Sequence, residues 1–457
     1  MSKVSSPDSP PNVLFAVVDS LRADVIFGNN SLETPTLDRL RAEGLSFNSC
    51  FSQGISTAPA MTAMLTGRYP LDYGGHWYIQ ENQPTFAEQF QSSGYQTGAI
   101  HSNPYVSSGR NFDKGFETFD EDIVDFEPDR HLEGLPDKIL RLTSRMIRLI
   151  KKTPYTPITE VNDRIEQWLD SNDDRSWFLW TQYMDVHGPY LPGGDFSYYN
   201  KLRAEWLWRK AAVRDPESVS KRQHEELWYN YRKEVEFFDQ EFGTLLDYLD
   251  ERGILNDTII VVVGDHGDEF NEHGWYGHCN LPYDELITVP LIIRFPDSMT
   301  VSQNQRFDTH VRCVDILPTI ADYANVDFSD TMNERLVGES IRPLIESGSP
   351  PSFDAAITEK KVWSGTDLRF GFRTEEWAYF YDGTDESTYL YNMRTDPGET
   401  INVVEQNPEV ATQFRERLEE RIEQIKLTSE GTEMRGTDIE VETGVGVDER
   451  LRALGYK

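Results

Sequence analysis

The stretch TIIVVVGDHG, residues 258–267, decides the fold class of this chain. Its β-branched apolar run predicts a strand that is buried on both faces, as in a parallel sheet. The strand ends at a glycine, and Asp265 and His266 follow directly. A second apolar run, NVLFAVVD at residues 12–19, ends in the same way on Asp19. Because open α/β sheets bind their ligands at the carboxyl ends of the strands, the two endings indicate a common site.

Helix and strand patterns alternate along most of the chain. The segment TPTLDRLRAEG, residues 34–44, has a capping threonine, an early proline and a terminal glycine, which together indicate a helix. Further helices are predicted over 85–94 and 223–252, and further strands over 95–102, 176–185 and 289–296. Alternation of this kind predicts an α/β fold whose mostly parallel sheet is flanked by helices.

The character of the sequence changes near residue 350. Short β-like pieces lie around residues 355–358, 368–373, 377–381 and 388–391, and a helix pattern follows at about 408–427. We therefore expect a disordered lead at 1–11, a catalytic domain at 12–350 with an insertion at about 121–230, and a C-terminal α+β subdomain at 351–457 that contains a small antiparallel sheet and a helix.

The composition is that of an acidic globular protein. The 457 residues include 78 Asp and Glu but only 44 Lys and Arg, so the formal net charge is −34. This excess fits a halophilic protein, since molar salt screens charge repulsion beyond about 3 Å; an acidic protein without salt adaptation is the alternative. General binding to nucleic acid is excluded, because it needs clustered positive charge.

Three sequence features bear on the compartment. No run reaches the roughly 18 to 20 apolar residues that span a bilayer. The leading MSKVSSPDSPPN has no apolar segment of the kind found in secretory signals. The three cysteines, Cys50, Cys279 and Cys313, are too few for a disulfide framework. We expect a cytoplasmic protein, and its oligomeric state stays open.

Two segments carry the chemistry that the residues themselves suggest. Asp19, Asp265 and His266 offer carboxylate and imidazole ligands of the kind that Zn²⁺ or Mn²⁺ prefers; strand-end turns with a capping Asp are the alternative. In FSQGISTAPAMTAMLTGRYP, residues 51–70, Thr57 stands just ahead of a helix pattern. A helix N-terminus favours an anionic ligand or a developing alkoxide, although an ordinary capping role explains the hydroxyl equally well.

Five segments occur in a defined order along the chain. They are NVLFAVVDSLRAD (12–24), STAPAMTAMLTGRYP (56–70), YMDVHGPY (183–190), TIIVVVGDHGDEFNEHGWYGHCNLPYDELITVPLIIRFP (258–296) and LYNMRTDPGETINVV (390–404). In order and spacing they resemble the motifs of the sulfatase family, which belongs to the alkaline phosphatase superfamily. The resemblance extends to a closing DERLRALGY (448–456) and implies an alkaline-phosphatase-like fold.

The resemblance assigns a role to individual positions. It implies that Asp19, Asp265 and His266 are metal ligands and that Thr57 takes the place of the nucleophile, bound to the same ion.

It also implies three further catalytic positions. His187 would contact the oxygens of the ester, and His278 would be the basic residue near the leaving group. Arg68 ends the Leu-Thr-Gly-Arg signature of the family.

Four positions that depart from the family pattern shape the functional prediction. Common sulfatases oxidise Cys or Ser to formylglycine where this chain has Thr57, and they carry Arg where it has Met61. A threonine at this position instead resembles the pattern of relatives that act on phosphoesters. Ser20 replaces a second metal-binding Asp, and His266 replaces an Asn. We therefore expect a site for one divalent ion (Mn, Zn or Ca), with a transition metal preferred.

The leading prediction is a metal-dependent hydrolase that cleaves a phosphoester or phosphodiester, carried by a sugar, a lipid or a small molecule, through Thr57. The alternatives are a sulfuric ester hydrolase that uses the unmodified hydroxyl, a transferase of phosphorylated head groups, and a binding module with a decayed site.

Other residues have weaker functional interpretations. Glu269 is a candidate for orienting His266, His273 lies near the metal pair in sequence, and His101 is either functional or a turn histidine. A basic stripe on the predicted helix at 137–152 suggests peripheral contact with a membrane; a lid that packs on acidic neighbours is the alternative.

Overall fold

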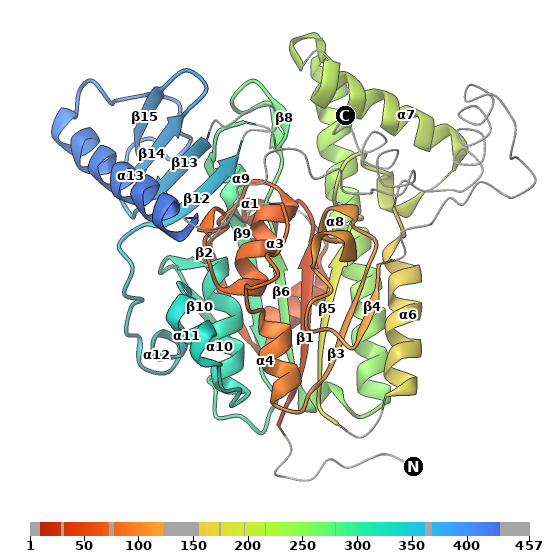
Figure 1. Cartoon of the computed structure of the whole chain (residues 1–457). Coiled ribbons are helices and arrows are strands. Elements are labelled where there is room, and N and C mark those ends of the chain that lie inside the picture. Colours follow the sequence, from red (N-terminus) through yellow and green to blue (C-terminus); the bar gives the residue numbers. More distant parts are fainter. Residues whose placement is uncertain are drawn as a thin grey trace, which may run out of the picture.

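The computed structural model describes residues 10–28, 32–72, 77–121, 155–172, 175–195, 197–214, 216–278, 280–361 and 368–429 (Figure 1). Most of the predicted disordered lead, the predicted basic stripe at 137–152 and the closing 448–456 segment lie outside these residues.

A nine-stranded sheet forms the centre of the molecule. Its order is β10 (Gln305–Phe307), β2 (Leu45–Phe51), β9 (Thr288–Arg294), β6 (Thr258–Gly264), β1 (Asn12–Val18), β5 (Trp177–Tyr183), β3 (Gln96–His101) and β4 (Thr118–Asp120), and β11 (Val311–Arg312) adds to β2. Only β9 runs antiparallel to its neighbours, β6 and β2. The predicted mostly parallel α/β sheet is confirmed.

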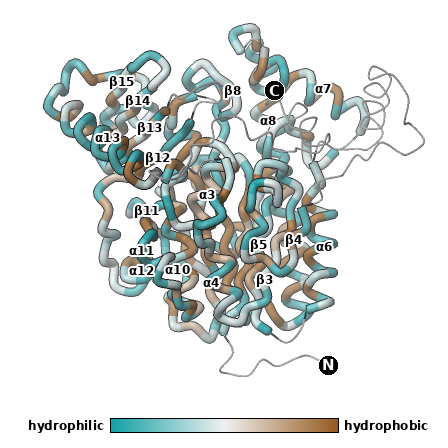
Figure 2. Tube along the Cα trace, viewed as in Figure 1, coloured by the Kyte–Doolittle hydropathy of each residue, from teal (hydrophilic) through white to brown (hydrophobic). Residues whose placement is uncertain are grey.

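Helices cover both faces of the sheet, because successive residues of a buried strand point to opposite sides. In β1, Leu14, Ala16 and Val18 pack beneath the helices of one layer, whereas Val13, Phe15 and Val17 face the other. The first layer contains α1 (Ala23–Phe27), α2 (Pro35–Glu43), α6 (Ile158–Ser171), α7 (Tyr198–Trp208) and α8 (Lys221–Glu251). The second contains α3 (Thr57–Thr66), α4 (Phe86–Ser92), α10 (Ile316–Tyr323), α11 (Asp330–Arg335) and α12 (Arg342–Ser347). Figure 2 shows apolar residues gathered in and around the central strands.

Local sequence signals account for where these helices begin and end. Thr85 caps α4 by accepting from the Glu88 N–H, and the Glu88 side chain reciprocally accepts from the Thr85 N–H, which forms a capping box. Gly67 ends α3 in a left-handed conformation with φ of 68°, which glycine adopts without strain.

The C-terminal subdomain is a separate antiparallel sheet covered by one helix. The strands β12 (Ala356–Lys361), β13 (Leu368–Arg373), β14 (Trp377–Asp382) and β15 (Ser387–Asn392) pair in chain order, and α13 (Pro408–Ser429) packs on them. Buried ion pairs tie this helix to the rest of the molecule: the Arg421 guanidinium lies 2.5 Å from Glu359 and 2.8 Å from Asp72. These strands and this helix agree with the pattern expected after residue 350.

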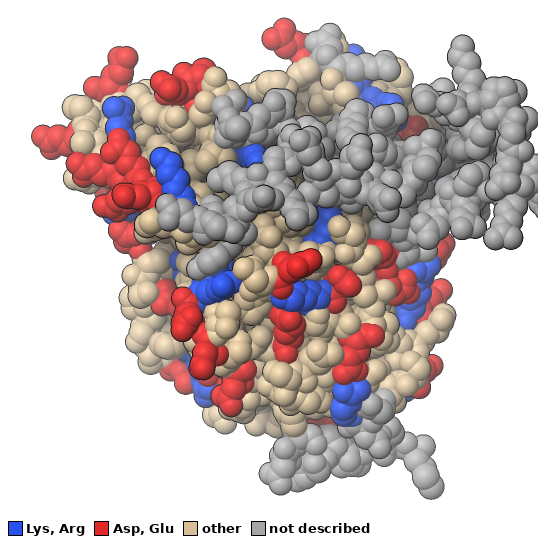
Figure 3. All heavy atoms as spheres, viewed as in Figure 1, with Lys and Arg blue, Asp and Glu red and all other residues tan. Residues whose placement is uncertain are grey.

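The surface reflects the acidic composition. Figure 3 shows more Asp and Glu than Lys and Arg on the face viewed, with a concentration of acid on the C-terminal subdomain. No helix of the described residues is long and apolar enough to cross a membrane.

Candidate active site

Two neighbouring strands bring the predicted metal ligands together. β1 and β6 are parallel and in register, with Val18 beside Gly264, so the residues that follow them, Asp19 and Asp265, are adjacent at the same edge of the sheet. Both side chains are fully buried. Ser20 connects them: its N–H donates to Asp265 Oδ1 at 3.1 Å, and its hydroxyl donates to Asp19 Oδ1 at 3.1 Å. The position where the family pattern has a second acid therefore holds a residue that fixes two carboxylates.

His266 completes the donor set. Its Nδ1 lies 3.0 Å from the Gly267 carbonyl oxygen, which requires the proton to be on Nδ1. Its Nε2 lies 3.6 Å from Asp19 Oδ1 and 3.7 Å from Asp265 Oδ2, and this buried atom has no hydrogen-bond partner. Buried polar atoms normally have partners. A divalent cation between one imidazole nitrogen and two carboxylates would satisfy all three, and this mixed donor set suits Zn²⁺ or Mn²⁺.

The electrostatics of this edge fit the same cation. Burial, together with repulsion from Asp19, raises the pKa of Asp265 well above its ordinary value. Two amide side chains soften the repulsion: Gln182 Nε2 lies 3.1 Å from Asp265 Oδ2 and 3.4 Å from Asp19 Oδ2, and Asn103 Nδ2 donates to Asp19 Oδ2 at 2.8 Å. Neither amide carries a positive charge, so the two carboxylates retain a net negative charge that a cation would neutralise.

Thr57 lies at the same point, as the first residue of α3. Its hydroxyl donates to Asp19 Oδ2 at 3.0 Å, and its side chain is buried. The helix N-terminus stabilises negative charge that develops on the hydroxyl oxygen. Met61, one helical turn later, is fully buried in the apolar core beneath α3 and contributes no polar group to the site.

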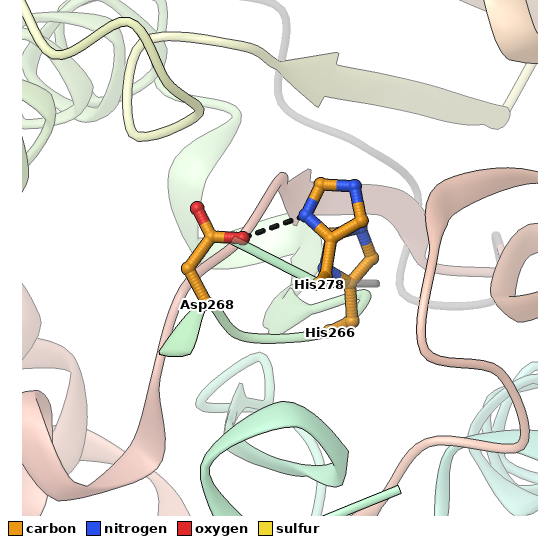
Figure 4. Close-up of side chains that lie close together, drawn as sticks. All are labelled: His266, Asp268 and His278. Atoms are coloured by element: carbon orange, nitrogen blue, oxygen red, sulfur yellow. Dashed lines mark hydrogen bonds and ion pairs between the residues drawn. The ribbon is translucent and has the colours of Figure 1, made fainter. Parts of the chain in front are cut away.

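A carboxylate–imidazole pair lies beside His266. His278 Nδ1 donates to Asp268 Oδ1 at 2.6 Å, and the Tyr190 hydroxyl donates to Asp268 Oδ2 at 2.7 Å. Figure 4 shows the Asp268 carboxylate turned toward the His278 ring, which lies against His266 with the ring centroids 4.4 Å apart. Although burial opposes it, the His278 ring holds the pKa of Asp268 below its ordinary value. Burial and then His266 lower the pKa of His278 to about 4.

His187 extends this row of imidazoles. Its ring centroid lies 5.4 Å from that of His278, and its Nδ1 lies 2.6 Å from the Gly188 carbonyl oxygen, which fixes the orientation of the ring. The structure thus brings His187 and His278 together beside the predicted metal ligand His266.

Arg68 lies at the other end of α3 from Thr57. It follows the last turn of the helix, whereas Thr57 begins it, and the ten residues of α3 at 1.5 Å each span roughly 15 Å. The buried Arg68 guanidinium donates to the carbonyl of Arg335, which ends α11. Arg68 thus joins the C-terminal end of α3 to α11, and its catalytic role stays a prediction.

The structure also shows the contacts of Glu269 and His101, which had weaker functional interpretations. Glu269 accepts from Asn280 at 3.3 Å and not from His266, so its predicted orienting role is wrong. His101 is enclosed by aromatic rings, and burial lowers its pKa to about 3. Its Nδ1 accepts from the N–H of Asn103, so this histidine positions an amide that contacts Asp19.

Sequence reasoning missed four residues of the site: Asn103, Gln182, Asp268 and Tyr190. One signal was available for one of them, because Gln182 is a polar residue within the fully buried strand β5, where a polar group needs a partner. No local pattern distinguishes Asn103 or Tyr190 from ordinary loop residues.

The fold and the site together define a class of enzyme. At the carboxyl edge of the α/β sheet, the site combines two carboxylates, an imidazole and a hydroxyl. Ester hydrolases that use a divalent metal need this set of groups. The family described as Sulfatase matches residues 11–326, and the family described as N-sulphoglucosamine sulphohydrolase, C-terminal, matches residues 271–427. The chain belongs to the sulfatase family of the alkaline phosphatase superfamily.

Individual relatives agree with this assignment. An N-acetylglucosamine-6-O-sulfatase of Bacteroides thetaiotaomicron is 25% identical, with 86% of this chain and 82% of the relative covered. An arylsulfatase of Clostridium perfringens is 24% identical, with 90% and 92% covered. The crystal structure of a phosphonate monoester hydrolase of Agrobacterium radiobacter superposes with a TM-score of 0.68 at 18% identity, covering 91% of this chain and 96% of that one.

Proposed function

We propose that this enzyme hydrolyses a phosphodiester or a similar singly charged phosphoester, with Thr57 as the nucleophile. The observation that carries the proposal is the position of the Thr57 hydroxyl, 3.0 Å from Asp19 Oδ2 and at the N-terminus of α3. A threonine cannot be converted to the aldehyde that common sulfatases use, and the buried Met61 supplies no group to bind one. The unmodified hydroxyl is therefore the reacting atom.

The chain's own residues divide the work. Asp19, Asp265 and His266 would hold a divalent cation, which when bound supplies positive charge that favours the alkoxide form of the Thr57 hydroxyl. The Thr57 hydroxyl gives up its proton to water and its oxygen attacks phosphorus. The bond from phosphorus to the leaving oxygen breaks, and that oxygen takes a proton back from water. The product of this half-reaction is a phosphoryl ester on Thr57.

Water then cleaves the ester on Thr57. His278 Nδ1 carries a proton, because it donates a hydrogen bond to Asp268. The neutral ring therefore has its lone pair on Nε2. This nitrogen takes the proton of the attacking water while the bond from phosphorus to Thr57 breaks. His187, whose ring lies beside that of His278, would contact the oxygens of the ester.

Charge balance favours a singly charged ester. Two carboxylates and a threonine alkoxide carry three negative charges against the two positive charges of the cation. Ser20, Asn103 and Gln182, which donate hydrogen bonds to these carboxylates, are neutral. The site therefore repels a monoanion less than it repels the dianion of a phosphate monoester. The phosphonate monoester hydrolase that shares this fold is named for a monoanionic ester.

A sulfuric ester is the second candidate substrate. It is also a monoanion, and it is the substrate class named for the relatives from Bacteroides and Clostridium. The same nucleophile and the same charge argument apply to it, so geometry alone favours neither ester.

A panel of chromogenic esters distinguishes the candidates. We expect metal-loaded enzyme to turn over bis-aryl phosphate faster than aryl phosphate or aryl sulfate, with Thr57→Ala as the blank. Fastest turnover of aryl sulfate would transfer the assignment to the second candidate. Equal rates for wild type and Thr57→Ala would refute both.

A further inference from the structure

A second cluster of potential metal ligands lies where the C-terminal subdomain meets the central sheet. His273 comes from the turn between β7 (Glu269–Phe270) and β8 (Tyr276–Gly277), Glu285 from α9 (Asp284–Ile287), and Glu399 from the loop after β15. One ligand atom of each residue lies within 4.8 Å of the others. The cluster shares no residue with Asp19, Asp265 and His266.

The histidine of this cluster is held in a fixed orientation. Its ring stacks on Tyr283, with the centroids 3.5 Å apart and the planes inclined by 5°. His273 Nε2 lies 3.2 Å from Glu285 Oε1, yet this buried oxygen receives no hydrogen bond. In a tetrahedral zinc site with bonds of 2.0–2.1 Å, neighbouring ligand atoms lie about 3.3 Å apart. The spacing is therefore that of two ligands on one ion.

A third carboxylate, that of Glu269, lies beside the cluster and has no role in the active site. Glu269 is fully buried, and it lies close enough to Glu285 to be repelled by it. Its Oε1 accepts from Asn280, but its Oε2 is buried and has no hydrogen-bond partner. An orphaned oxygen on a side chain fully removed from water is costly unless a cation or a proton satisfies it.

The charges around the cluster do not balance. Among the described residues, Arg373 is the guanidinium bonded to the cluster, and it lies 3.1 Å from Glu399 and 2.7 Å from Asp284. No Lys or Arg of the described residues forms an ion pair with Glu269 or Glu285, which contact Asn280 and His273 respectively. Each oxygen of Glu399 can accept a second interaction beyond its bonds to Arg373 and to the N–H of Asp284. The cluster therefore has both spare ligand atoms and excess negative charge.

We propose that His273, Glu285 and Glu399 bind a second divalent cation of the Zn²⁺ type, with Glu269 as an additional ligand or an acceptor for bound water. This ion would join the C-terminal subdomain to the hairpin of β7 and β8, which leads directly to His278. Its function is structural, and it is independent of the ester that the active site cleaves.

Metal stoichiometry tests this proposal. The purified chain is stripped with a chelator, reloaded with Zn²⁺ and washed, and bound metal is measured by mass spectrometry. We expect two ions per chain in wild type and one in either His273→Gln or the double variant Asp265→Asn/His266→Ala. His224→Gln, on α8, is the matched control and should retain two.

Other results overturn the proposal. One ion in wild type that is lost in Asp265→Asn/His266→Ala, two in His273→Gln, or none in Asp265→Asn/His266→Ala would each show that the cluster takes no metal. Should His273→Gln fail to fold, Co²⁺ loaded into Asp265→Asn/His266→Ala decides instead, because the proposal requires the visible absorption of a low-coordinate cobalt site, and its absence would contradict it.

Discussion

Replacing Asp268 by alanine should cost activity without unfolding the enzyme. The carboxylate accepts from His278 Nδ1 at 2.6 Å and from the Tyr190 hydroxyl at 2.7 Å, and all three side chains are buried. A hydrogen bond to a charged group is worth about 1.5–3 kcal/mol. At 1.36 kcal/mol per factor of ten, its loss corresponds to roughly a 10- to 150-fold decrease in kcat/KM.

The assay compares kcat and KM on bis-aryl phosphate for wild type, Asp268→Ala, Asp268→Asn and Tyr190→Phe. Asn retains an oxygen that can accept from His278 Nδ1, so Asp268→Asn should recover part of the lost activity. Tyr190→Phe, which leaves the contact with His278 in place, is the matched control and should lose less than Asp268→Ala. Nitrogen-15 NMR of the histidines should show the Nδ1–H tautomer of His278 in wild type and its loss in Asp268→Ala. Unchanged kcat/KM in Asp268→Ala, with the tautomer intact, would refute the reasoning.

Two further predictions concern stability. Arg421→Met leaves the buried carboxylates of Glu359 and Asp72 without their cation, so the free energy of unfolding in urea should fall by about 3–5 kcal/mol; a loss below 1 kcal/mol would show that the pairs contribute little to docking of the C-terminal helix. Burial raises the pKa of Asp185 to about 7, against the opposing hydrogen bond from the Ile158 N–H. A carboxyl whose pKa is raised in the folded chain stabilises the fold fully when the pH is below the pKa of the unfolded chain, near 4. This stabilisation is lost as the pH rises from there through 7. Urea titrations at pH 5 and pH 8 should therefore show Asp185→Asn gaining roughly 2–4 kcal/mol on wild type across this interval, whereas a difference independent of pH would exclude a titrating Asp185.

The central sheet was predictable because its inner strands are buried on both faces. Continuous apolar runs such as those of β1 and β6 arise only where no face meets water. The direction of β9 was not predictable, because the pattern of apolar residues indicates which faces of a strand are buried. It does not indicate whether the strand runs parallel or antiparallel to its neighbours. The strands β4, β10 and β11 have three residues or fewer, too short to carry a pattern.

The site was predictable where a local signal coincided with the edge of the sheet. Asp19 and Asp265 follow buried strands directly, and Thr57 begins a helix. Gln182 was missed because its contact with both carboxylates depends on the pairing of β5 with β1, which no local segment encodes. The predicted role of Arg68 rests on its closeness to Thr57 in sequence, whereas the two residues lie at opposite ends of α3.

A covalent ester on Thr57 is the most direct sign of the mechanism. Metal-loaded enzyme turning over bis-aryl phosphate is quenched in acid, digested and mapped by mass spectrometry. The account predicts an aryl phosphoryl group on the peptide that contains Thr57, and its absence from Thr57→Ala. Sustained turnover without any adduct at Thr57, or with the adduct on another side chain, would contradict it.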